Sequence, residues 1–193
     1  EGPLTKDLVE IAGVDFKITT VISIAAVMII IALCLKSFSL PFVLVLSIEL
    51  AIMINEGLTV ITGSKVPFIA PAVIGCVQLG ATVDYAILLT NRYKQELANG
   101  FNRRKAMLIA ANASDYSIFK SVLVFFSATF SVYLISDVDI VKDLCMLLAR
   151  GSVISGLIII FLMTPLLVTL QKAITGSTID FERKIVSKGE IKQ

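Results

Sequence analysis

The sequence predicts an all-α integral membrane protein with five transmembrane helices. Of its 193 residues, 56% are hydrophobic and 17% are charged, whereas soluble domains carry about 25% charged residues. The mean hydropathy is +0.91. The apolar residues gather in five stretches close to the about 20 residues that cross a bilayer. This composition excludes a disordered chain, a disulfide scaffold and most soluble enzymes.

The five stretches are residues 18–35, 40–55, 66–90, 118–135 and 144–170. Each is expected to be a helix, because a chain in lipid must satisfy its own backbone polar groups. Pro41, Pro67 and Pro71 fall in first turns, where a missing N–H costs little. Pro165 lies inside the last span and is expected to kink it.

The segments outside the spans carry their own expectations. Residues 1–17 are interpreted as the end of an extracytoplasmic region or a lead-in helix, and 171–193 as a basic cytoplasmic tail. In the cytoplasmic loop 91–117 the third helix should continue to Ala98, with Gly100 ending it. Asn102 is a candidate cap for a short helix over 103–111. The amphipathic pattern of that helix fits the inner leaflet, and the alternative is a solvated connector.

Lysine and arginine predict the orientation, because they concentrate in cytoplasmic loops. One side carries twelve: Lys36, Arg92, Lys94, Arg103, Arg104, Lys105, Lys120, Lys172, Arg183, Lys184, Lys188 and Lys192. The other carries four: Lys6, Lys17, Lys65 and Lys142. The N-terminus is therefore expected outside and the C-terminus in the cytoplasm. The net charge of +2 gives no reason to expect a nucleic-acid partner.

Three ionisable residues, Glu49, Asp84 and Arg150, fall inside the spans. A charge at the centre of a span costs roughly 2.5–3.5 kcal/mol, so each is a candidate functional residue. At 1.5 Å per residue, Asp84 and Glu49 lie about 10 and 12 Å from the inner surface, and Arg150 lies about 10 Å from the outer one. Asp84 either carries a proton or is a permanently protonated or paired group that holds helices together.

The neighbours of Asp84 favour a role in the interior. On a helical wheel it shares a face with Gly80, and small residues there predict close approach of another helix. Tyr85 adds a hydroxyl that can donate to a carboxylate and relay a proton. Three further polar residues are expected to support the site: Gln78, Asn55 and Arg150, the last as the anchor of a helix end or a carboxylate. Glu49 is either a second proton site or a partner of Arg150 or Lys65.

The sequence lacks the motifs of several kinds of catalytic and binding site. The chain has no histidine, and its three cysteines form no C-x-x-C pair. Residues 62–65 lack the spacing of a phosphate-binding loop. We therefore expect no catalytic residues, no metal site and no bound cofactor.

Residues 78–94, QLGATVDYAILLTNRYK, resemble the fourth-helix motif of the MmpL-type branch of resistance–nodulation–division (RND) transporters. Residues 48–55 and 149–155 resemble the third and sixth helices. Members of this family have two parallel halves of six helices, each with an extracytoplasmic porter domain after its first helix. The resemblance implies that the five spans are helices two to six of the C-terminal half, with the basic tail as the protein's own C-terminus.

The resemblance also implies a function. The Asp-Tyr pair of this family lies in the proton path, which assigns that role to Asp84 and Tyr85. The protein is then an exporter of lipids or other hydrophobic or amphiphilic compounds in the bacterial cytoplasmic membrane, with the proton gradient as its energy source. The implied partners are the bilayer, the substrate, and the N-terminal half and porter domain that this chain lacks. An oligomer of the whole protein is left open.

Two alternatives remain. A SecD/SecF-like accessory subunit of protein translocation shares the topology and a charged fourth helix, although it lacks the Asp-Tyr pair in this wording. A non-transporting domain that senses lipid or scaffolds partners needs the same helices without a titrating Asp84. An intramembrane enzyme is disfavoured, because no catalytic set is present.

Overall fold

The computed structural model describes residues 3–35, 37, 39–63 and 70–170, with side chains from residue 13 onward. Its elements are α1 (Pro3–Leu35), α2 (Ser39–Thr62), α3 (Ala70–Ala98), α4 (Arg103–Ile135), α5 (Asp139–Ile158), the π-helical η1 (Ile159–Met163) and α6 (Thr164–Thr169). Five helices are long and apolar enough to cross a membrane, the last formed by α5, η1 and α6 together. The predicted fold class is therefore confirmed. The predicted basic tail, 171–193, lies outside the described residues, as do Lys65 and Pro67.

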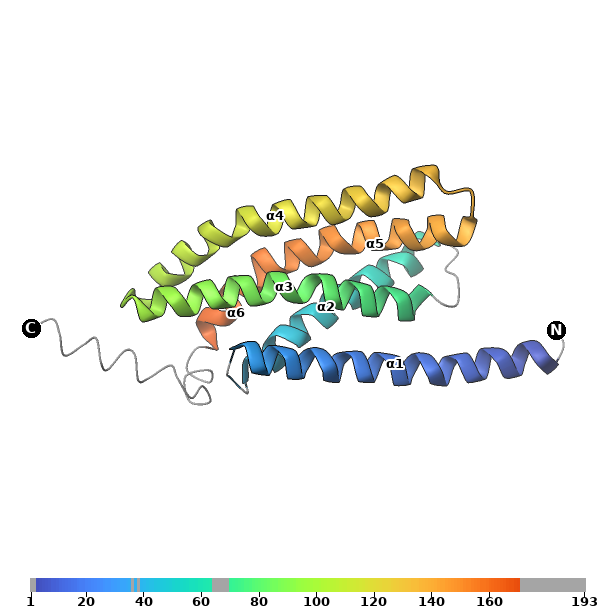
Figure 1. Ribbon diagram of the computed structural model, residues 1–193, viewed down its shortest axis with the longest axis horizontal. Helices are drawn as coiled ribbons and strands as arrows, with labels where there is room; N and C mark the ends of the chain where they lie inside the picture. The colour runs from blue at the N-terminus through green and yellow to red at the C-terminus, as the bar shows by residue number, and fades with distance from the viewer. Residues whose placement is uncertain (1–2, 36, 38, 64–69, 171–193) are drawn as a thin grey trace, which may run out of the picture.

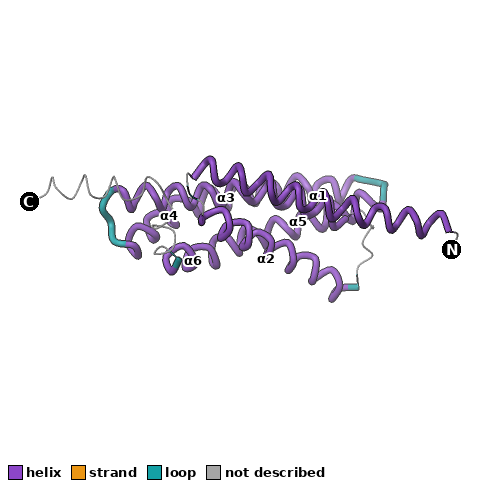
Figure 2. The backbone as a smooth tube through the Cα atoms, turned by 90° about the horizontal axis from the view of Figure 1, so that it is seen from below, coloured by secondary structure: helices purple, strands orange, loops and turns teal. Residues whose placement is uncertain are grey.

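Consecutive spans run in opposite directions along the bundle, and α6 continues the direction of α5 (Figure 1). The central helix is α3, which packs against α1, α2, α4 and α5. Short turns join α3 to α4 and α4 to α5 at opposite ends, as the tube in Figure 2 makes visible. The centre is filled by fully buried side chains from different helices, among them Leu44, Ile48, Leu89, Ile118 and Ile159.

One close approach depends on glycine. A Cβ atom built on Gly156 of α5 would lie 2.6 Å from Cγ2 of Val122 on α4. Membrane helices associate largely through packing of this kind, because lipid tails are as apolar as the side chains. Gly156 therefore sets how near α4 and α5 come.

Two predicted boundaries are wrong. The second span is predicted to end at Asn55, but α2 continues to Thr62 and therefore also carries Glu56. The helix over 103–111 is not a separate element on the inner leaflet, because it forms the first turns of the 33-residue α4. No glycine or proline interrupts residues 103–135, so nothing breaks the helix. Met107 of this segment is buried in the bundle.

The turn between α3 and α4 agrees with its prediction. Gly100 has a φ of +88°, the left-handed conformation that ends helices and favours glycine. The backbone N–H of Arg103 donates to the Asn102 side chain at 2.7 Å, so Asn102 caps α4. The predicted loop 91–117 is therefore reduced to residues 99–102.

The last span is distorted just before its proline. Pro165 has no N–H to donate, and its ring crowds the carbonyl of Phe161, four residues earlier. That carbonyl lies in η1, where the helix widens to π geometry. The Thr164 hydroxyl donates to the Ile160 carbonyl at 2.7 Å, which satisfies a carbonyl in the widened turn. The predicted disturbance at Pro165 is thus a π-helical turn.

Candidate functional site

The central helix α3 carries two polar regions on different faces. The first, called the polar hub, comprises Asn55, Thr59, Gln78, Arg150 and Ser155, from α2, α3 and α5. The second, called the Asp84 groove, lies between α3 and α4. The two regions hold the polar residues that the sequence singled out, except Glu49, which lies in another groove.

The side-chain amides of the hub are buried, and all their donors and acceptors are hydrogen-bonded. Asn55 and Gln78 are 1% and 2% exposed. The Asn55 amide donates to the Gln78 side-chain carbonyl at 3.1 Å and to the Leu147 carbonyl at 3.2 Å. The Gln78 amide donates to the Ser155 hydroxyl at 2.7 Å and to the Gly151 carbonyl at 3.3 Å. These bonds tie three helices together.

Arg150 completes the hub. Its Nε donates to the Asn55 side-chain oxygen at 2.9 Å, and a terminal nitrogen donates to the Asn55 carbonyl at 2.7 Å and to the Thr59 hydroxyl. Arg150 thus anchors α2 and pairs with no carboxylate among the described residues, so of the alternatives for Glu49 the pairing with Arg150 is not found. Beside it, a Cβ on Gly151 would lie 2.5 Å from Gln78 Oε1, so the hub requires glycine there.

The Asp84 groove has a volume of about 680 Å³. Its lining includes Asp84, Tyr85 and Leu88 from α3, and Lys120, Ser121 and Phe125 from α4. The Asp84 side chain is exposed, whereas Tyr85 next to it is 8% exposed. Within the described part of the chain, no hydrogen bond or ion pair reaches the Asp84 carboxylate. The carboxyl group is therefore open to the groove, unlike the hydrogen-bonded polar groups of the hub.

Lys120 was missed as a site residue, because the sequence placed it at the edge of the fourth span. Since α4 begins at Arg103, Lys120 instead lies well inside the helix and faces the same groove as Asp84. Its ammonium lies over the Tyr116 ring, 4.1 Å from the centroid. The uninterrupted helical pattern from residue 103 was the signal that could have revealed it.

The close approach expected beside Asp84 does not occur within the described chain. Cβ atoms built on Gly75 and Gly80 meet nothing within 4 Å, and Gly80 and Val77 are exposed. Gly80 therefore lies on an open face of α3, whereas Gly75 lines a groove that α3 shares with α1 and α2.

Glu49 lies in a different groove, of about 490 Å³, bounded by α1, α2 and α3. Lys17 and Glu56 also line it. Asp84 is not among its lining residues, so the similar depth of the two carboxylates does not bring them to one site. Glu56 went unnoticed because the sequence assigned it to a loop, although it lies seven residues after Glu49 and hence on the same helical face.

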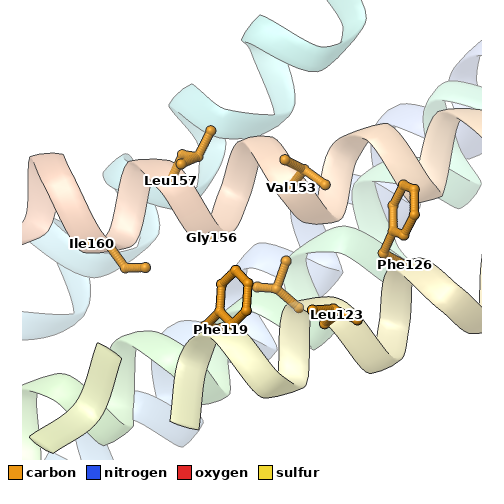
Figure 3. Close-up of a pocket in the computed structure, with 8 residues that line it drawn as sticks. Phe119, Leu123, Phe126, Val153, Gly156, Leu157 and Ile160 are labelled. Carbon is orange, nitrogen blue, oxygen red and sulfur yellow. The ribbon is translucent and has the colours of Figure 1, made fainter. Parts of the chain in front are cut away.

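A third groove, of about 180 Å³ between α4 and α5, is lined by apolar residues alone. Figure 3 shows Phe119 and Leu123 of α4 opposite Val153 and Leu157 of α5. It offers no polar group to orient a ligand. Nor does the described part of the chain hold three His, Cys, Asp or Glu residues placed to bind a metal ion.

Comparison with known proteins gives consistent relatives. The model of the MMPL family matches residues 1–184. "Probable transport protein MmpL6" of Mycobacterium tuberculosis is 24% identical over 170 residues, which cover 86% of this chain and 42% of that protein. "Probable transport protein MmpL4" of Mycobacterium leprae is 25% identical over 170 residues, covering 86% and 17%. The membrane protein YdgH of Bacillus subtilis is 26% identical over 132 residues, covering 65% and 15%. The chain therefore spans less than half the length of each relative. No solved structure matches.

Proposed function

This chain belongs to the MMPL family, and we propose that it is the membrane part of a proton-driven exporter of lipids or other hydrophobic compounds. Asp84 takes up and releases the proton, and Tyr85 relays it. The observation that carries this proposal is a carboxylate inside a membrane span, open to a groove and beside a buried tyrosine. The names of the mycobacterial relatives, which describe transport proteins, also support it.

The surroundings of Asp84 favour a proton carrier over a group that only holds helices together. A structural polar group in a membrane is bonded to its neighbours, as Asn55 and Gln78 are. Asp84 has no such partner among the described residues. A carboxylate facing lipid costs roughly 2.5–3.5 kcal/mol when charged, so it is stabilised either by a proton or by protein that covers it.

The open face of α3 supports a partner from the rest of the same protein. Gly80, one turn before Asp84, leaves space beside it, and small residues allow helices to approach closely. The chain is also much shorter than its relatives. We therefore assign this face to the contact with the missing half. Protonation of Asp84 then changes which packing of the two halves is favoured, which drives transport.

The ends of the bundle support the orientation. The end formed by the α3–α4 turn carries Arg103, Arg104 and Lys105, whereas the α4–α5 turn at the other end carries Asp137 and Asp139. Cytoplasmic loops are enriched in lysine and arginine. Lys120 lies inside α4, and its removal from the count leaves the bias intact. The α3–α4 turn is accordingly assigned to the cytoplasm of a bacterium and the N-terminus to the outside.

The test uses the full-length protein in cells loaded with the hydrophobic dye Nile red. Wild type should export the dye, and a protonophore should stop the export. Asp84→Asn should abolish it while the protein stays folded and in the membrane. Asp137→Asn, in the turn outside the bundle, serves as the matched control and should export normally.

Other outcomes contradict the proposal in distinct ways. Normal export by folded Asp84→Asn would rule out the proton relay through Asp84 and favour the lipid-sensing or scaffolding alternative. Export that resists the protonophore removes proton coupling. Wild-type protein that never exports Nile red contradicts the substrate class, and a secretion defect in its absence favours the SecD/SecF-like alternative.

A further inference from the structure

We propose that Lys120 is the mobile counter-ion of Asp84, moving between the Tyr116 ring and the Asp84 carboxylate as the proton returns and leaves. This inference rests on the proposed function of Asp84 as a proton carrier. It adds a third residue to that site and gives the groove between α3 and α4 two charge states.

Among the described residues, the groove is lined by one cation and one carboxylate. Asp84, Tyr85 and Lys120 are the titratable residues that line it, and all its lining residues come from α3 and α4. Asp115, also on α4, is not among them. Arg92, two turns after Asp84 on α3, lies 3.9 Å from Glu96 in an ion pair. Lys120 is therefore the cation positioned to neutralise a negative charge on Asp84.

The observed position of Lys120 is one end of the movement. Its ammonium lies 4.1 Å from the centroid of the Tyr116 ring, a cation–π contact. Tyr116 is one helical turn before Lys120, so the two side chains are neighbours on α4. The flexible four-carbon stem of lysine lets the ammonium leave the ring while the helix stays fixed.

Electrostatics decides which position is occupied. Inside a membrane, where the dielectric constant is low, attraction between an ammonium and an ionised carboxylate exceeds the attraction of an aromatic ring. A protonated Asp84 offers no such attraction, and the ammonium then rests on Tyr116. When the proton leaves Asp84, the ammonium replaces the lost positive charge, so the carboxylate is never left uncompensated in the membrane.

The test measures the protonated fraction of Asp84 in the full-length protein. Membrane vesicles are treated with dicyclohexylcarbodiimide, which reacts with protonated intramembrane carboxyl groups, and the Asp84 peptide is quantified by mass spectrometry. At pH 7.5, Lys120→Gln should raise the labelling of Asp84 about tenfold, because a nearby cation no longer favours the ionised form. Lys120→Arg should label as wild type does. Lys142→Gln, in α5 and outside the groove, should also leave the labelling unchanged.

Tyr116 provides a second test that keeps Lys120 in place. Tyr116→Leu removes the resting position of the ammonium, so Lys120 stays with Asp84 and labelling should fall severalfold. Tyr116→Phe retains the ring and should behave as wild type.

The failures can be told apart. Equal labelling in wild type, Lys120→Gln and Tyr116→Leu overturns the counter-ion and leaves Asp84 as a proton carrier. No labelling of Asp84 in wild type at any pH between 5.5 and 8.5 overturns both proposals.

Discussion

The polar hub and the Asp84 groove share the helix α3, yet the amides of the hub are buried and hydrogen-bonded, whereas Asp84 in the groove is exposed and unpaired among the described residues. In the hub, Asn55 and Gln78 are buried and each is hydrogen-bonded to the other and to α5. In the groove, Asp84 is exposed and the Lys120 ammonium lies over the Tyr116 ring. Hydrogen-bonded amides have a fixed protonation state, whereas an unpaired carboxylate can change its own. The comparison separates a part that holds the bundle from a part that can respond to protons.

The largest effect on stability is expected at Gly151. Gly151→Ala places a Cβ 2.5 Å from Gln78 Oε1 and 2.6 Å from Asn55 Nδ2. Overpacking costs about 1–3 kcal/mol, and the displaced amides also lose hydrogen bonds. We expect the free energy of unfolding in detergent to fall by about 3 kcal/mol. The matched control is Gly57→Ala, whose Cβ meets nothing within 4 Å; an equal loss in that variant would contradict the assignment.

Arg150→Met tests the cation of the hub and should have the next largest effect. It removes bonds to the Asn55 side chain, the Asn55 carbonyl and the Thr59 hydroxyl. Because such bonds in membrane proteins average about 0.6 kcal/mol each, the expected loss is about 2 kcal/mol, measured by unfolding in detergent. A loss under about 0.5 kcal/mol would mean that the hub does not anchor α2.

Gly156→Ala probes an apolar contact outside both polar regions. The new Cβ would lie 2.6 Å from Val122 Cγ2, so Val122 must move and α4 must separate slightly from α5. We expect a loss of about 1 kcal/mol and a faster exchange of amide hydrogens in this part of α4. Unchanged exchange would show that the α4–α5 contact tolerates the methyl group.

The smallest effect on stability is expected at the groove. Asp84→Asn should change the free energy of unfolding by less than about 0.5 kcal/mol, as substitutions without bonded partners do, while it abolishes transport. A loss comparable to that of Arg150→Met would remove the contrast between hub and groove and return Asp84 to a structural role.

Much of the fold follows from the sequence, because a membrane span can be recognised from its length and apolar composition alone. The end of α3 and the cap of α4 were also predictable, since Gly100 and Asn102 are residues whose backbone and side chain determine helix ends. The continuity of α4 was missed because polar residues before residue 118 suggested a loop. A helix can continue beyond its apolar stretch whenever no breaking residue interrupts it.

The site was predictable residue by residue but not as an arrangement. Asp84 and Glu49 were recognisable because charges in spans are costly. Which helix faces meet depends on packing, and depth alone does not determine it. The similar depth of Glu49 and Asp84 allowed contact without predicting it, and the two residues line separate grooves. Lys120 was hidden for the same reason, because its position became informative only once α4 was known to begin at Arg103.

The central claim is that Asp84 carries the proton, and proton flux tests it most directly. Full-length protein is reconstituted in liposomes with the pH-sensitive dye pyranine inside, and a pH gradient and membrane potential are imposed. Wild type and Asp137→Asn should move protons across the membrane, and folded Asp84→Asn should show only the leak of empty liposomes. Proton flux in Asp84→Asn equal to that of wild type would contradict the account.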